Sequence, residues 1–192
     1  MFSLTRPNAS TFARFLAESK DLPLSYSPIG LAQSSARGFV LDEARIELGV
    51  GEAVFARACQ ALREWRQFDL GWAEIVPRGA STEVGTVVAV LVQHLGFWSL
   101  NGCRVVAPLG SDADTERFGY VYGTLTNHAE TGEEIFAVTR DVRTGRVVYE
   151  LRAASHPRAW LAWCGYPVTR SLQARFRRDS CAAMKRAVET SD

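Results

Sequence analysis

Residues 146–154, RVVYELRAA, carry apolar side chains at every second position, Val147, Tyr149, Leu151 and Ala153, with the charged residues Arg146, Glu150 and Arg152 between them. Successive side chains of a β-strand point to opposite faces, so this segment predicts a strand with one buried face. Earlier segments also predict strands, at residues 44–48, 70–76, 84–94, 97–107, 118–125 and 133–140. Because the later links between them are too short for a crossover helix, the pattern favours an antiparallel sheet.

Two helical patterns flank the run of later strands. After the strand at 44–48, apolar residues recur in steps of three and four on one helix face: Val54, Phe55, Ala58, Leu62 and Trp65. A longer pattern covers residues 158–188, where Pro167 must interrupt or kink the helix. Its apolar stripe beyond that proline is Val168, Leu172, Phe176, Ala183 and Ala187. We expect this terminal helix to pack on the concave face of a sheet built from residues 69–154.

The first 38 residues differ in texture from the rest of the chain. Asn8 or Ser10 can cap a short helix, and residues 21–38 are rich in serine, proline and glycine, which is typical of irregular chain. We therefore expect an N-terminal helix and irregular extension, residues 1–38, packed on the core of one main domain, residues 39–192.

Composition and charge argue against several classes of protein. The 22 basic and 21 acidic residues leave a net charge of +1, which argues against a generic nucleic-acid binder. The longest apolar run, residues 84–92, is far shorter than the roughly 20 residues that span a bilayer, so we expect no stable membrane insertion. The start of the chain lacks the features of a secretory signal, and we expect a cytoplasmic protein.

The residues that could bind metal or act as nucleophiles are scattered. The four cysteines form no CxxC pair and there are only three histidines, so we expect neither a metal site nor a disulfide framework. The chain has no phosphate-binding loop and no dinucleotide fingerprint, and we expect no cofactor. Cys103 is the one candidate nucleophile, because the charge of Arg104 beside it would favour a thiolate. Since no histidine is placed near Cys103, we favour a structural role for it.

The order of elements is strand, helix, antiparallel strands and long terminal helix. This order resembles the helix-grip architecture of the START lipid-transfer domains, the Bet v 1-like plant allergens and the aromatic polyketide cyclases. The resemblance implies an α+β fold in which a strongly curved antiparallel sheet wraps around the long C-terminal helix. It also implies a cavity between sheet and helix.

Short motifs along residues 25–189 add a closer resemblance. They are LGVG at 48–51, FDLGW at 68–72, LNGCRV at 100–105, FGYVYGTL at 118–125, His128 with GEEIF at 132–136, GYP at 165–167, Gln173, Phe176, Asp179 and Ser180. Together they resemble an uncharacterised bacterial and plant family, domain of unknown function 1990 (UPF0548-type). The family has no established activity, so this resemblance implies a fold and leaves the chemistry open.

Polar side chains gather at the hairpin between the strands at 118–125 and 133–140. His128 lies in its turn. Pairing of the strands would bring two tyrosines near two carboxylates: Tyr120, Tyr122, Glu133 and Glu134. A tyrosine, a histidine and a carboxylate at one end of a sheet can move protons on a carbonyl ligand. We expect Tyr120 or Tyr122 at the rim of the cavity; the alternative is that His128 is a solvated turn residue and that both glutamates face water.

Arg104 lies in an apolar strand and needs either water or a partner, because an unpaired buried guanidinium is very costly. One hypothesis pairs Arg104 with Glu133 or Glu134 at the polar end of the cavity. Tyr122 would join this pair, which would fix the head of an amphipathic ligand. The alternative places Arg104 on the outer face of the sheet, among charged residues of the strand at 146–154.

The terminal helix carries five arginines away from its apolar stripe: Arg170, Arg175, Arg177, Arg178 and Arg186. Such a set can contact acidic lipid headgroups or RNA, but Asp179 and Glu189 dilute its charge. We therefore expect a solvated helix face.

Two functions fit these features. The first is a binding module that holds a small apolar or amphipathic molecule in the cavity and has no nucleic-acid partner. The alternative is a cyclase, dehydratase or isomerase that uses tyrosine, histidine and glutamate in the same cavity. An apolar cavity with one or two ordered polar groups would favour binding, whereas a perturbed carboxylate within reach of Tyr122 would favour the enzyme. A protein that binds partners by its surface ranks third, and the oligomeric state is open.

Overall fold

One antiparallel sheet organises the part of the chain that the computed structural model describes, residues 1–33, 38–157 and 166–189. Its strands follow the order β2-β8-β7-β6-β5-β4-β3, and β1 pairs with the first residues of β5. The strands are β1 (Phe2–Ser3), β2 (Val40–Val50), β3 (Ala73–Val76), β4 (Val87–His94), β5 (Phe97–Leu109), β6 (Thr115–Thr124), β7 (Glu130–Asp141) and β8 (Arg146–Pro157). All these pairings are antiparallel, as the short links predicted.

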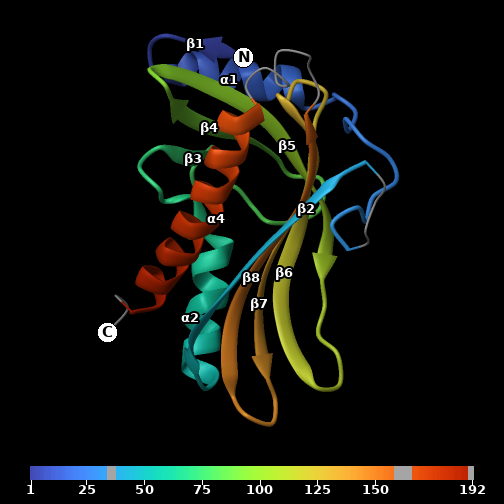
Figure 1. Cartoon of the computed structure of the whole chain (residues 1–192), viewed down its shortest axis with the longest axis vertical. Coiled ribbons are helices and arrows are strands. Elements are labelled where there is room, and N and C mark those ends of the chain that lie inside the picture. Colours follow the sequence, from blue (N-terminus) through green and yellow to red (C-terminus); the bar gives the residue numbers. More distant parts are fainter. Residues whose placement is uncertain (34–37, 158–165, 190–192) are drawn as a thin grey trace.

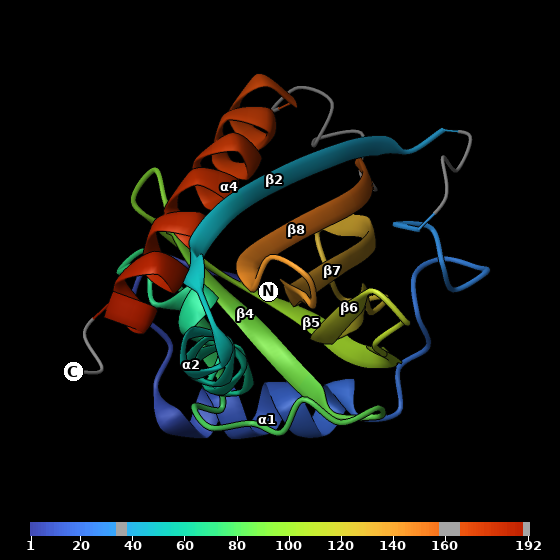
Figure 2. The ribbon, with the colours of Figure 1, turned by 90° about the horizontal axis from the view of Figure 1, so that it is seen from below.

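The described helices lie on both sides of this sheet. They are α1 (Ala9–Ser19), α2 (Glu52–Arg63), the short 3-10 helix η1 (Arg66–Phe68) and α4 (Tyr166–Glu189). Helices α2 and α4 lie side by side on the concave face, and α1 lies on the outer face beside β4 and β5 (Figures 1 and 2). The predicted helix-grip arrangement, a curved antiparallel sheet around a long C-terminal helix, is confirmed. Among the described helices, none combines the length and apolar character needed to cross a bilayer.

Two irregularities in strand pairing bend the sheet. The register shifts between Glu47 and Gly49 where β2 pairs with β8, and between Val105 and Ala107 where β5 pairs with β6. An extra residue on one strand increases the local twist and bends that strand. Gly49 has a φ of 141°, a conformation that suits glycine and strains other residues. These bends help to form the concave face on which α2 and α4 pack.

Aromatic side chains form the centre of the core on the concave face. Tyr120 of β6 and Phe136 of β7 are cross-strand partners, and both are almost completely buried. The ring of Phe68 in η1 lies 5.6 Å from the ring of Phe136. Phe176 of α4 lies 5.0 Å from Phe68, so it has the packing role that the helix stripe predicted. These rings join the sheet, η1 and α4 in one core.

The N-terminal residues cover the outer face of the sheet. Phe15 of α1 packs against Leu91 of β4, and Leu31 packs against Val121 of β6. Between these contacts the chain forms a short antiparallel bridge beside the end of β6. Burial of these apolar side chains stabilises the extension on the sheet.

Element boundaries differ from the prediction at several points. Helix α4 begins one residue before Pro167, so this proline lies in the first turn, where its missing N–H group costs no helical hydrogen bond. The helix predicted ahead of it, residues 158–165, lies outside the described residues. Val168, predicted in the apolar stripe, is 41% exposed. Strand β2 begins at Val40 rather than at Ala44.

Candidate functional site

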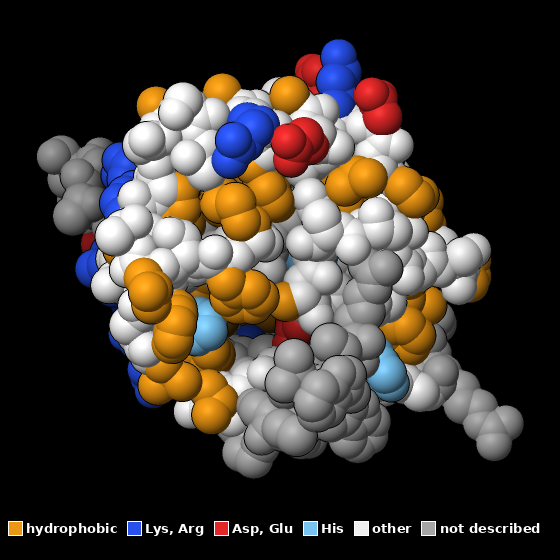
Figure 3. All heavy atoms as spheres, turned by 90° about the horizontal axis from the view of Figure 1, so that it is seen from above, with side chains coloured by type: hydrophobic (Ala, Val, Ile, Leu, Met, Phe, Trp, Pro, Cys, Tyr) orange, Lys and Arg blue, Asp and Glu red, His pale blue; other side chains and the backbone are white. Residues whose placement is uncertain are grey.

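A hollow opens at the end of the molecule that carries the start of α4. Figure 3 looks onto this end and shows acidic and basic side chains at the base of the hollow, with hydrophobic side chains along its side. Concave sites with apolar walls and a few polar groups are typical of small-molecule binding. The charged groups between α4 and the sheet are therefore the candidate site.

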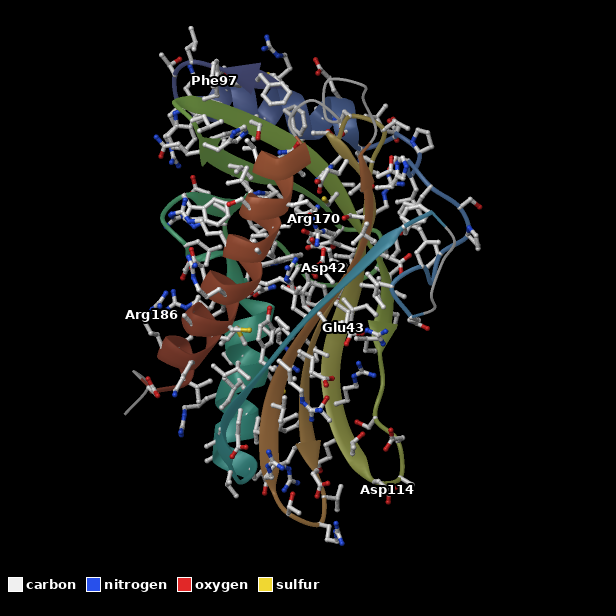
Figure 4. All side chains as sticks on the ribbon, in the orientation of Figure 1. Asp42, Glu43, Phe97, Asp114, Arg170 and Arg186 are labelled. Atoms are coloured by element: carbon white, nitrogen blue, oxygen red, sulfur yellow. The ribbon has the colours of Figure 1, made fainter. Side chains whose placement is uncertain are left out.

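An ion-pair cluster joins α4 to β2. Asp42 is buried and accepts from two arginines of α4. Arg170 donates to both carboxylate oxygens, with 2.8 Å between Nη2 and Oδ1, and Nη1 of Arg177 lies 3.0 Å from Oδ1. Figure 4 shows Asp42 and Arg170 pointing toward each other between the strand and the helix. The two arginines are about two helical turns apart and so share one face of α4.

Gln173 links this ion pair to β7 and β8. Its Nε2 donates to Oε1 of Glu130 at 2.8 Å and to Oγ of Ser155 at 3.0 Å, while its Oε1 accepts from Arg170 at 2.6 Å. Burial raises the pKa of Glu130, and the hydrogen bond from Gln173 and the charge of Arg170 oppose this rise. Glu130 therefore holds a proton more readily than an exposed glutamate does.

Tyr122 and Glu134 face each other across β6 and β7 on the concave side. The Tyr122 hydroxyl donates to Oε2 of Glu134 at 2.7 Å. Loss of water around the carboxylate raises the pKa of Glu134 to about 7, against the lowering effect of the Tyr122 hydrogen bond. The negative charge of Glu130 raises this pKa as well, and the positive charge of Arg177 lowers it. Glu134 therefore exchanges a proton near neutral pH.

These polar groups are enclosed by protein but keep some contact with solvent. Glu130, Glu134 and Gln173 are each partly accessible, although they lie between α4 and the sheet. The neighbouring side chains on the concave face, Cys103 and Tyr122, are buried. The polar group thus lies between α4 and the aromatic core. It consists of Asp42, Tyr122, Glu130, Glu134, Ser155, Arg170, Gln173 and Arg177.

The family of this chain follows from sequence comparison. A family model described as a domain of unknown function, DUF1990, matches residues 25–183, a range that contains the whole polar group. The chain belongs to the DUF1990 family. A UPF0548 protein of Dictyostelium discoideum is 34% identical over 98% of this chain and 96% of its own length. The UPF0548 protein At2g17695 of Arabidopsis thaliana is 31% identical over 80% of this chain and 76% of its own. The family resemblance predicted from short motifs is confirmed.

Solved structures of low sequence identity share the fold of this DUF1990 chain. The hypothetical protein jhp0584 from Helicobacter pylori matches 83% of this chain and 92% of its own, with a TM-score of 0.52 and 11% identity. The di-domain ARO/CYC StfQ from the steffimycin biosynthetic pathway matches 79% of this chain and 51% of its own, with a TM-score of 0.52 and 12% identity. At such identities the likeness concerns the fold alone.

Of the six site residues predicted from sequence, Tyr122 and Glu134 come into direct contact. Tyr120 lies within the aromatic core, where its hydroxyl accepts from Nε2 of Gln67 at 2.6 Å. Tyr120 is 1% exposed and Tyr122 is 4% exposed. The prediction that one of them rims the cavity is therefore wrong, because both rings belong to the packed core.

The predicted pairing of Arg104 with Glu133 or Glu134 is also wrong. Arg104 of β5 and Glu133 of β7 lie on the outer face, on either side of Gly123 in the strand between them, β6. Glu134 points to the concave face instead. The Tyr26 side chain lies over Gly123, where an added Cβ would collide with the tyrosine hydroxyl. The ring of Tyr26 thus occupies the space through which the two charges would meet.

Arg104 and Glu133 instead hold the N-terminal extension. Arg104 donates to the carbonyl oxygens of Lys20 and Leu22 at 2.7 and 3.0 Å. The buried carboxylate of Glu133 accepts from the backbone N–H of Gly30 at 2.9 Å. Arg104 is on the outer face, as the alternative expected, but it contacts the extension rather than the charged residues of β8.

His128 lies in the turn before β7 and is half-buried. Its Nδ1 accepts from the backbone N–H of Glu130 at 2.9 Å, which orients the ring within the turn. The ring lines a cavity of about 350 Å³ together with Asn101 and the first two residues of the chain. A second cavity of about 340 Å³ lies at the edge strand β3, beside Trp72 and Trp98.

Cys103 lacks the properties of a nucleophile. It is completely buried, and burial, with the charges of Glu134 and Glu130, raises the pKa of its thiol well above the ordinary value. The thiol therefore stays protonated, as expected for a structural cysteine. Within residues 1–33, 38–157 and 166–189, no three His, Cys, Asp or Glu side chains are grouped so as to hold a metal ion.

Sequence reasoning missed most of the polar group. Asp42 and Glu130 lie just outside the predicted strands, and Gln173 was noted only as part of a motif. Arg170 and Arg177 were assigned to a solvated helix face, and this prediction is wrong because both bind Asp42. Their spacing of about two turns was the available signal, since it places both on one side of the helix.

Proposed function

We propose that the concave face beneath the N-terminal half of α4 binds a small amphipathic molecule. The Tyr122–Glu134 pair carries this proposal, because it combines enclosure by protein, partial accessibility and a pKa of about 7. Burial of the Glu134 carboxyl group costs free energy, and two apolar side chains at these positions would avoid that cost. Strongly perturbed carboxyl groups in concave sites are typical of functional positions.

The two ends of such a ligand would meet different surroundings. Glu134 offers an acceptor or a proton to a polar head, and the Tyr122 hydroxyl holds the carboxyl group in place. The apolar part would lie against partly accessible apolar side chains of the concave face, such as Phe176 of α4, whose ring lies 6.5 Å from the buried ring of Phe136. A polar contact next to an apolar surface suits an amphipathic molecule rather than a wholly polar one.

Tryptophan fluorescence tests the proposal, because the Trp65 ring lies 6.4 Å from the Tyr122 ring. Titration with long-chain fatty acids, alkylamines and flat polycyclic compounds should change the emission with at least one of these classes. Tyr122→Phe should weaken binding of that compound by about tenfold, because Glu134 loses the hydrogen bond that holds its carboxyl group in place.

Tyr120→Phe is the matched control. It removes the same hydroxyl group from a buried tyrosine of the same strand, but Tyr120 bonds to Gln67 inside the core rather than to Glu134. Binding by this variant should stay within about threefold of the wild type. An emission that no compound changes, or equal weakening in both variants, would show that the proposal is wrong.

The same carboxyl group favours a second candidate function, an acid/base enzyme of the cyclase, dehydratase or isomerase type. A general acid or base works best when its pKa lies near the working pH, and the pKa of Glu134 meets this condition. Glu134→Gln keeps a hydrogen-bond acceptor for Tyr122 and removes proton transfer. Mass spectrometry of the recovered compound separates the two functions: a chemical change that Glu134→Gln abolishes means an enzyme, and an unchanged compound means a carrier.

A further inference from the structure

The charges around the proposed site do not balance. Three carboxyl groups and two guanidinium groups of the described residues meet beneath α4: Asp42, Glu130, Glu134, Arg170 and Arg177. Both guanidinium groups bond to Asp42. The side chains that donate to the other two carboxyl groups are uncharged, Gln173 to Glu130 and Tyr122 to Glu134. The fully ionised group would therefore carry one excess negative charge.

This distribution of charge discriminates between ligand head groups. A ligand carboxylate would have to compete with Asp42 for the two arginines, and it would lie beside Glu130 and Glu134. Like charges in a poorly solvated site repel strongly. A positively charged head would balance the excess negative charge of the group.

Resting on the function proposed above, we propose that the head group bound at this site is a cation, such as an alkylammonium group, held by Glu134 with Glu130 beside it. An ammonium group has three N–H donors and no acceptor, which suits the Glu134 carboxylate, and the negative charge of Glu130 adds to the attraction. The Tyr122 hydroxyl occupies one oxygen of Glu134, Oε2, and so orients the carboxylate toward the head group.

The cation competes with a proton for the same carboxyl group. Among the described residues, the ionisable groups that face Glu134 come from six elements: Asp42 of β2, Cys103 of β5, Tyr122 of β6, Glu130 of β7, Tyr149 of β8 and Arg177 of α4. Burial raises the pKa of Cys103, Tyr122 and Tyr149 well above their ordinary values, so all three stay neutral between pH 6 and 8. Glu134, with a pKa of about 7, changes from mostly protonated to mostly ionised over this range.

The direction of the pH dependence follows from this competition. An alkylammonium ion keeps its charge throughout, so its affinity should rise by about tenfold from pH 6 to pH 8 as Glu134 loses its proton. Ionisation of Glu130 acts in the same direction. A carboxylate ligand would show the opposite sign, because it needs the proton that is lost.

Calorimetric titration with three probes of equal chain length tests the inference: octylammonium, octanoate and octanol at pH 6 and pH 8. Octylammonium should bind at least about tenfold more tightly than octanol at pH 8, as expected for a poorly solvated charge pair. Glu134→Gln should remove most of this preference and most of the pH dependence, because only Glu130 remains beside the head group, and leave octanol binding within about threefold. Glu47→Gln removes the same charge from an exposed ion pair with Arg146 and should change neither.

The outcomes separate failure of this inference from failure of the proposed function. Octanol or octanoate binding as tightly as octylammonium at pH 8 would overturn the cationic head and leave the site on the concave face standing. A preference for octylammonium that persists undiminished in Glu134→Gln would likewise overturn the cationic head and leave the site standing. Absence of binding by all three probes at both pH values would overturn the cationic head and the proposed function together.

Discussion

Replacement of Phe136 by alanine is expected to lower the free energy of unfolding by about 3–5 kcal/mol, the usual cost of truncating a buried phenylalanine. Phe136 has no exposed surface. Its ring centre lies 5.3–6.5 Å from the centres of four other rings, those of Phe68, Tyr120, Tyr122 and Phe176. The residue therefore connects the sheet with η1 and α4. Urea titration of the wild type and the variant measures the loss.

Phe97→Ala serves as the control for this measurement. Phe97 is 45% exposed at the start of β5, so its truncation should change the free energy of unfolding by less than about 1 kcal/mol. A loss for Phe136→Ala as small as that for Phe97→Ala would mean that the aromatic core does not hold η1 and α4 on the sheet.

Asp42→Asn is expected to destabilise the protein by about 3 kcal/mol, because it leaves two guanidinium groups of α4 without their carboxylate. The asparagine has nearly the same volume, so the effect reports charge rather than packing. Hydrogen exchange should also quicken in the N-terminal half of α4, around Arg170, more than in its C-terminal half. Urea titration and exchange mass spectrometry measure the two effects.

The exposed pair of Glu47 and Arg146 provides the comparison on the same strand. It joins β2 to β8 with 2.7 Å between Nη2 and Oε2, and both side chains are about half exposed. Glu47→Gln should cost less than about 1 kcal/mol, as exposed ion pairs do. Equal costs for Asp42→Asn and Glu47→Gln would contradict the role of Asp42 in fixing α4.

Local periodicity was enough to predict most of the sheet. The alternation in residues 146–154 identifies a strand with one buried face because the period of two is a property of each strand alone. The same rule places Cys103 and Arg104 on opposite faces, as found. Short links then imply antiparallel neighbours, since a crossover needs more residues.

The surroundings of Arg104 could not be predicted in this way. Residues 21–38 have no periodicity, so their sequence does not say which face of the sheet they cover. In the fold, Tyr26 from this segment lies over Gly123, and the space between Arg104 and Glu133 is filled. A strand pattern gives the direction of a side chain, and the covering segment determines its partner.

The polar group beneath α4 was beyond prediction for a related reason. Its members come from β2, β6, β7, β8 and α4, and contacts between distant elements leave no local pattern. The helix period shows that Arg170 and Arg177 share a face. The helix period does not identify Asp42 as the partner of these arginines, because Asp42 lies ahead of the strand predicted at residues 44–48.

The most direct test of the proposed site is an NMR titration of methyl-labelled protein with octylammonium at pH 8. Neighbouring residues of one strand point to opposite faces, so methyl groups close in sequence report on different sides of the sheet. Val105 and Leu151 on the concave face should show the largest shift changes, and Val121 and Ile135 on the outer face should change little. Changes confined to Val121 and Ile135 would contradict a binding site between the sheet and α4.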